Sequence, residues 1–291
     1  MSASPAFDCR EAVPQARAWR VGSHPLPEVI CVQRVTSEIA PRVHERASLM
    51  FIGSRATVRL ESHRNVATDH ESILFVPPRL LHGVNRFVPA PNESLTLLLG
   101  APFEADLPAG QGPVLVSQRA LGSHVASLLA DANGLLSAVG FVGTIQSILK
   151  ELMRRGAPVR IARSTRATPL IPVRDYLRAH VEESVSIESL VRLSGLTEFH
   201  LIRTFHREFG LPPHAYHVRL KLARAREMLL SGATVARTAF ACGFADQSHL
   251  SRKFKEVYGL TPATWMTAVA PKSPAIPFTT KARLRAQPRR S

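Results

Sequence analysis

Two segments in the last third of the chain carry side chains of the types that recognise DNA. Glutamine can pair with adenine, arginine with guanine, and serine or histidine with either a base edge or a phosphate. The first segment supplies Glu198, Phe199, His200, Arg203, His206 and Arg207. The second supplies Asp246, Gln247, Ser248, His249, Arg252, Lys253 and Lys255. Any soluble helix has a charged outer face, so the residue types alone do not separate DNA contact from a solvated surface.

The two segments belong to an internal repeat. With a shift of 48 residues, the matched positions are Ser186, Ile187, Val191, Leu193 and Gly195 with Thr234, Val235, Ala239, Ala241 and Gly243. With a shift of 49, the match continues through Leu201, Phe205, Gly210 and Pro213 with Leu250, Phe254, Gly259 and Pro262. Cap residues, apolar positions, a glycine and a proline recur in order. Because the polar faces also recur in register, the repeat favours DNA contact over a merely solvated surface.

Each copy predicts a helix, a short glycine turn and a second helix. Ser186 and Thr234 are good N-cap residues, and Gly195 and Gly243 suit the left-handed turn of a tight corner. This is the helix-turn-helix unit, predicted at about residues 187–208 and 235–258. The apolar stripe within residues 215–231 predicts one long helix between the units. If both second helices enter one side of a duplex, they would occupy successive major grooves about 34 Å apart.

The N-terminal half has the pattern of a β domain. From residue 29 to 100, short apolar runs about a dozen residues apart are separated by turn residues, and residues 56–61 alternate strictly between apolar and polar. We expect an antiparallel barrel or sandwich. Helices within about residues 117–155 follow it and would form either a dimer interface or a cover for the barrel, which leaves a homodimer open. The domain is predicted to span residues 1–155.

This half offers few residues for catalysis. His44 and His82 could approach each other across neighbouring strands, and a barrel mouth is a natural ligand site. The pair His44-Glu45 is not a zinc-protease motif, because position 48 is serine. The other histidines and acids have no spacing that makes them converge, so the sequence predicts no metal, no cofactor and no catalytic residues.

The chain is strongly basic, with 37 lysines and arginines against 22 acids and a net charge of +15. Such an excess favours a polyanionic partner. More than half of it lies in two acid-free segments, residues 156–168 and residues 271–291. The first is predicted to be an interdomain linker and the second a disordered basic tail. The tail would either bind phosphates weakly or serve solubility.

Three distant cysteines without a CxxC pair favour a reducing compartment over a disulfide framework or a thiolate zinc site. The first residues lack the apolar region of a signal peptide, and the longest uncharged stretch, residues 132–149, is shorter and more polar than a membrane span. We therefore expect a cytoplasmic protein without membrane contact.

The repeat resembles a known family. The segment beginning at Gly243, GFADQSHLSRKFKEVYGLTP, is similar to the signature of AraC/XylS-type bacterial transcription regulators, and LVRLSGLTEFHLIRTFHREFGLPPHAY is similar to that family's first motif. The resemblance implies an all-α DNA-binding domain, residues 169–270, with two helix-turn-helix motifs. It also implies base contacts by the early residues of each second helix, which adds Ile202, an apolar side chain suited to a thymine methyl group.

The N-terminal half is similar in layout to the cupin-like sensory domain of many such regulators. Phe75-VPPRLLHGVN resembles a cupin second motif, whereas the first metal motif of cupins is missing. This favours an effector-binding or purely dimerising barrel. The expected effector contacts are His44, Phe51, Phe75, His82 and Asn85.

The leading hypothesis is a sequence-specific transcription regulator controlled by a small molecule, with double-stranded promoter DNA as its partner and RNA polymerase as a further one if it activates. One alternative is a cupin-type metal-dependent enzyme that carries a DNA-binding tail. Another is an architectural protein that coats DNA without sequence preference and with a steep dependence on salt.

Overall fold

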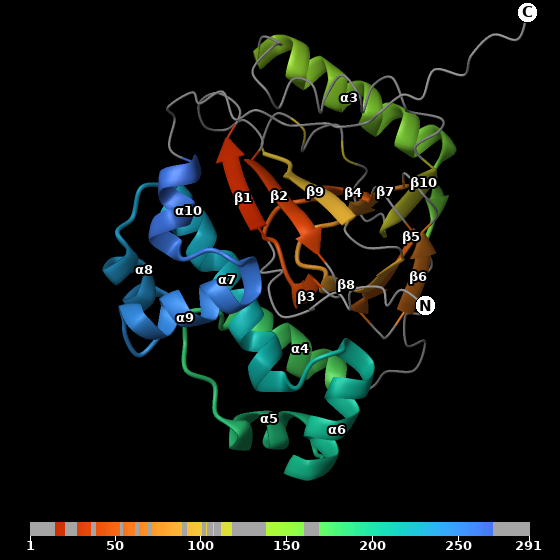
Figure 1. The fold of residues 1–291 in the computed structure, drawn as a ribbon. Coiled ribbons are helices and arrows are strands. Elements are labelled where there is room, and N and C mark those ends of the chain that lie inside the picture. Colours follow the sequence, from red (N-terminus) through yellow and green to blue (C-terminus); the bar gives the residue numbers. More distant parts are fainter. Residues whose placement is uncertain are drawn as a thin grey trace, which may run out of the picture.

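The computed structural model describes residues 15–20, 28–35, 39–52, 55–61, 64–68, 72–88, 92–100, 103, 107, 112–117, 138–159 and 169–269. These residues form two antiparallel sheets, one long helix against them, and a C-terminal helical domain (Figure 1). The predicted two-domain fold, with a β sandwich first and the helix-turn-helix units last, is confirmed.

The first sheet has the strand order β1-β2-β9-β4-β7-β10-β11, and the second has the order β3-β8-β5-β6. The strands are β1 Gln15–Arg20, β2 Glu28–Val35, β3 Ile39–Arg42, β4 Ser48–Ile52, β5 Arg55–Leu60, β6 Arg64–Thr68, β7 Ser72–Val76, β8 His82–Val88, β9 Asn92–Leu98, β10 Val114–Ser117 and β11 Ala157–Pro158. All the pairings between them are antiparallel.

The first sheet is covered on both faces at its centre. Strands β4 and β7 are buried at every position, which is why they read as continuous apolar runs and not as alternation. Phe51 and Phe75 pack toward α3, Ala138–Arg155, whereas Met50 and Leu74 belong to the core shared with the second sheet. Helix α3 therefore covers this sheet. A cover for the β domain and a dimer interface were the two roles predicted for the helices of this region. The helix expected around residues 121–129 lies outside the described residues.

Residues 156–159, within the predicted linker, are more ordered than a linker would be. Ala157–Pro158 form β11, which pairs with β10, and the Val159 amide donates to the Pro113 carbonyl at 2.8 Å. The backbone of β10 supplies the hydrogen-bond partners of these residues, and no sequence pattern predicts this pairing. Residues 160–168 and the basic tail, 271–291, lie outside the described part of the chain.

The helical domain contains two helix-turn-helix units joined by a long helix. Its helices are α4 Leu170–Ala179, α5 Ile187–Ser194, α6 Glu198–Phe209, α7 Pro213–Leu230, α8 Val235–Ala241, α9 Gln247–Tyr258 and α10 Pro262–Val269. Ser186 and Thr234 cap α5 and α8 through their side chains, as predicted. Gly195 and Gly243 have φ of 67° and 64°, the left-handed conformation that their turns require.

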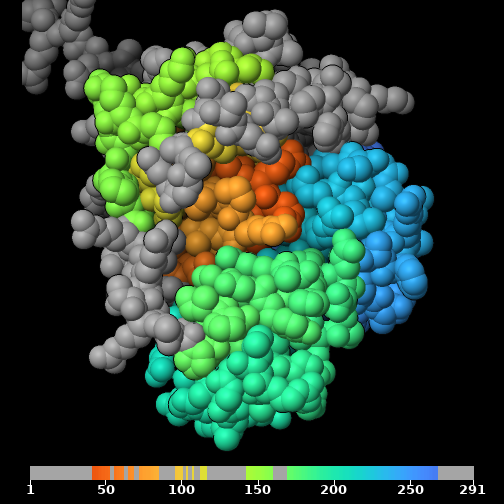
Figure 2. Space-filling model, turned by 180° about the vertical axis from the view of Figure 1, so that it is seen from behind, coloured from red at the N-terminus to blue at the C-terminus, as the bar shows by residue number. Residues whose placement is uncertain are grey.

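Helix α7 lies at the centre of the molecule. It is buried on most of its surface, because it packs between the two helix-turn-helix units and also against the strands. Seen from behind, the first half of the helical domain lies beneath the strands and the second half beside them (Figure 2). Within the described chain, no helix has both the length and the apolar character needed to cross a bilayer.

Candidate nucleic-acid interface

Helices α6 and α9 each bury one face and expose the other. The buried stripe of α6 includes Leu201 and Phe205, and that of α9 includes Leu250 and Phe254. The residues predicted to contact DNA lie on the opposite faces. Those that are exposed are Glu198, Phe199, His200, Arg203, His206, Arg207, Asp246, Gln247, Ser248, Arg252 and Lys255, and those that are half-buried are Ile202, His249 and Lys253. Most of these side chains are thus exposed in the folded chain.

Some of these side chains make contacts within the protein. The Asp246 carboxylate caps α9 by accepting a hydrogen bond from the His249 amide at 2.7 Å. The His249 ring lies edge-on against Phe244, with ring centroids 5.4 Å apart. Lys253 donates to Glu256 at 2.9 Å. Gln247, Ser248 and Arg252 are exposed on α9.

The five candidate effector contacts lie in different places. Phe51 and Phe75 are in the core beneath α3. His44 and His82 lie together, as predicted, with ring centroids 4.9 Å apart, although His44 lies in the segment after β3 and not in a strand. They face the helical domain, because His44 contacts Arg226 of α7. Asn85 belongs to β8, and its side chain is outside the described set.

Hydrogen bonds fix the tautomers of the two histidines. An arginine only donates, so the bond of 2.8 Å between Arg226 Nη1 and His44 Nδ1 leaves the His44 proton on Nε2. His82 Nδ1 donates to the Leu80 carbonyl at 2.9 Å, which leaves its Nε2 as an acceptor. Burial, followed by the charge of Arg226, lowers the pKa of His44 well below its usual value. Burial also lowers the pKa of His82 to about 4. Both rings are neutral at pH 7.

This arrangement does not suit a metal. A metal on His44 Nε2 would move the proton to Nδ1, where it would face the Arg226 donor. Among the described residues, no cluster of three or more histidine, cysteine, aspartate or glutamate side chains could hold an ion. The pair serves instead as a contact between the domains.

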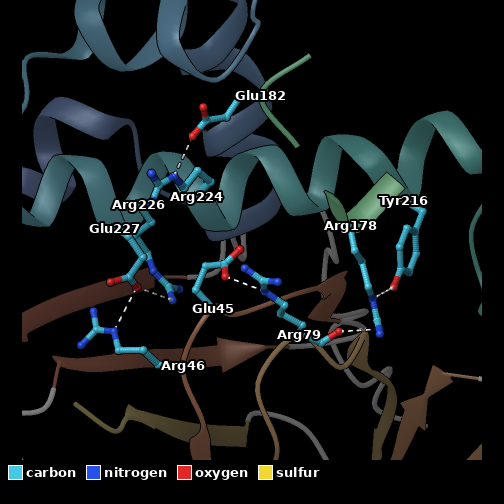
Figure 3. A network of polar contacts seen from close by, with 9 residues as sticks. All are labelled: Glu45, Arg46, Arg79, Arg178, Glu182, Tyr216, Arg224, Arg226 and Glu227. Carbon is cyan, nitrogen blue, oxygen red and sulfur yellow. Dashed lines mark hydrogen bonds and ion pairs between the residues drawn. The ribbon is translucent and has the colours of Figure 1, made fainter. Parts of the chain in front are cut away.

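A second buried contact joins the domains through Glu61, which follows β5. Its carboxylate accepts a hydrogen bond from the Tyr216 hydroxyl at 3.2 Å and pairs with Arg178 at 3.4 Å. Arg178 also donates to the Arg79 carbonyl at 2.9 Å (Figure 3). Arg79 has a φ of 59°, a conformation uncommon outside glycine. The turn that carries Arg79 thus holds a strained backbone where it meets the helical domain.

Helix α7 makes further polar contacts with the N-terminal domain. Arg46 pairs with Glu227 at 3.0 Å, and Arg219 donates to the Pro41 carbonyl at 2.7 Å (Figure 3 shows the first). Sequence reasoning missed this interface. One signal was present: Arg226 falls within the apolar stripe of α7, four residues after Leu222 and three before Leu229. A charged residue at such a position needs a buried partner.

The following similarities each cover about a third of the chain or less. A helix-turn-helix domain family model matches residues 190–268. The uncharacterized HTH-type transcriptional regulator YbfI of Bacillus subtilis is 32% identical over 105 residues, 35% of this chain and 38% of that protein. The HTH-type transcriptional activator RhaS of Escherichia fergusonii is 38% identical over 92 residues, 30% of this chain and 32% of that protein. A solved structure of a probable AraC family transcriptional regulator from Rhodopseudomonas palustris is 30% identical, covers 35% of this chain and 97% of its own, and has a TM-score of 0.32.

The C-terminal domain belongs to the AraC/XylS family of helix-turn-helix transcriptional regulators. The resemblance predicted from the second motif is confirmed. The matched residues of this AraC/XylS-family domain include both recognition helices, α6 and α9. The chain spans only about a third of the length of the two curated relatives. Those relatives are named as regulators of transcription and not as enzymes, as the sequence predicts for this chain.

Proposed function

We propose that this chain is a sequence-specific regulator that reads double-stranded promoter DNA with α6 and α9. The observation that carries the proposal is the pair of exposed faces, repeated in register on two helices that both pack against α7. In a helix-turn-helix unit the early residues of the second helix reach base edges. Gln247, Ser248 and Arg252 would read bases, and Arg207 and Lys255, later on their helices, would contact phosphates.

We further propose that the N-terminal domain controls DNA binding through α7. Contacts from Arg46, His44 and Pro41 hold this helix, which in turn sets the separation of α6 and α9. A small molecule bound in the N-terminal domain would act by favouring one arrangement of these contacts over another. The candidate effector contacts remain His44, Phe51, Phe75, His82 and Asn85. Because its partner is a bacterial promoter, the protein would act in the cytoplasm, with RNA polymerase as a further partner if it activates.

Selection from a library of random duplexes tests the proposal. We expect the full chain to enrich a consensus with two conserved segments whose centres lie about 10 base pairs apart, one helical turn. A chain with Gln247, Ser248 and Arg252 replaced by alanine should keep the segment read by α6 and lose the other. Recovery of DNA with no consensus would contradict the proposal and favour the architectural alternative.

A further inference from the structure

The two recognition helices differ in one systematic way. In the register of the repeat, His200 and Arg203 of α6 match His249 and Arg252 of α9, so these two types are shared. At two outward positions where α9 has serine, α6 has an apolar residue. Phe199 and Ile202 stand where α9 has Ser248 and Ser251.

The Phe199 side chain is one of three large hydrophobic side chains, with Leu193 and Phe240, that are exposed among the described residues. It is 74% exposed, and Ile202, three residues later on the same side of α6, is half-buried. The core stripe of α6, with Leu201 and Phe205, lies on the other side and does not use Phe199. The Phe199–Ile202 pair is therefore an apolar patch on the face proposed to enter the groove.

The surroundings of this patch favour DNA as its occupant. Arg203 and Arg207 are exposed on the same helix, so their charges complement flanking phosphates. The apolar group that the major groove offers is the C5-methyl of thymine. Serine at the matching positions of α9 has no comparable apolar surface for a methyl group.

We propose that α6 recognises thymine methyl groups through Phe199 and Ile202, while α9 recognises its segment through hydrogen bonds. This inference rests on the proposed function and assigns the type of base that the first unit reads. Phe199 contacts one methyl group in the major groove, and Ile202 contacts the same or a neighbouring one. The two units thereby prefer different sequences, which gives the site a direction.

The test replaces each thymidine of the selected site by deoxyuridine, which removes the methyl group and keeps the hydrogen-bonding edge. For the full chain, one or two replacements in the α6 segment should weaken binding about fourfold each, the factor expected for one buried methyl group. Replacements in the α9 segment should have no such effect. Phe199→Ser, which introduces the residue that α9 carries, should lose the deoxyuridine effect at the thymidine that Phe199 contacts.

Matched variants make the outcome decisive. Ser248→Ala, at the same register position of α9, should keep the deoxyuridine effect, and Ile202→Ser should reduce it. An unchanged thermal midpoint of Phe199→Ser would show that the variant folds, as expected for an exposed position. The inference is overturned if no replacement weakens the binding of the wild-type chain, or if Phe199→Ser retains the full deoxyuridine effect at every thymidine of the α6 segment. Phe199 would then contact something other than DNA, such as another protein. Because the site has been selected first, absence of any consensus would signal failure of the proposed function instead.

Discussion

Arg252 combines exposure, an early position on α9 and a side chain that can form two bonds to guanine. We expect Arg252→Ala to weaken binding to the selected site by about 1–3 kcal/mol and to relax the preference at one base pair. Competition titrations with all four bases at that position would measure both effects. Lys150→Ala on α3 removes the same charge far from the recognition helices and should leave the preference intact. An equal loss on random DNA would show that Arg252 contacts a phosphate.

Glu61 shows what a buried residue contributes at the contact between the domains. Its side chain is almost fully buried and accepts from Tyr216 and Arg178. Glu61→Ala leaves these two donors without their acceptor, so we expect a loss of about 1–3 kcal/mol in the free energy of unfolding. Urea denaturation would measure it. Glu151→Ala, which breaks an exposed ion pair on α3, should cause no measurable change; a similar loss in both variants would contradict this account of Glu61.

The sequence predicted the exposed recognition residues because helical periodicity separates the two faces of α6 and α9. It did not predict the partners of His44 and Glu61, which lie 182 and 155 residues away in Arg226 and Tyr216. Periodicity reports that a residue is buried but not which distant element buries it.

The two turn glycines provide a test at the level of the elements. Gly195 and Gly243 have similar positive φ values. A Cβ at Gly195 would meet open space, whereas one at Gly243 would lie 2.7 Å from the Glu182 carbonyl oxygen. Gly195→Ala should therefore cost about 1–2 kcal/mol from backbone conformation alone, and Gly243→Ala should cost more. Urea unfolding midpoints would compare them, and equal losses would contradict the close approach.

The elements were predicted with uneven success, for a physical reason. The helix-turn-helix units have local signals, since caps, glycines and stripes all lie within one repeat. Helix α3 has an equally clear apolar stripe, but such a stripe does not indicate whether the helix packs against the sheet of its own chain or against a second chain. Strand β11 pairs only two residues with an edge strand, and such a pairing depends on tertiary proximity and not on sequence pattern.

For the whole molecule, buried histidines predict how stability depends on pH. His44, His82 and His217 have lowered pKa values, mainly through burial, and those of His82 and His217 are about 4. Between about pH 6.5 and pH 4 the unfolded chain binds protons that the folded chain does not, so stability is lost as the pH falls. Burial raises the pKa of Glu61, and this shift alone would increase stability as the pH falls. Because it concerns one group and the histidines are three, we expect the histidines to dominate.

Urea denaturation at pH 7, 6 and 5 should therefore give a decreasing free energy of unfolding. His82→Gln should show a shallower decrease, because it removes one of the groups involved. A free energy that stays constant from pH 7 to pH 5 would show that these histidines titrate in the folded protein as they do in the unfolded chain.

The most direct test of the central claim is the specificity ratio of the full chain. It compares binding to the selected duplex with binding to random duplex, measured by competition at about 150 mM salt. We predict a ratio above about 10³, the range of sequence-specific regulators, which falls sharply when the base-reading residues of α6 and α9 are replaced together. A ratio near one would contradict the claim that the two exposed helix faces read DNA sequence.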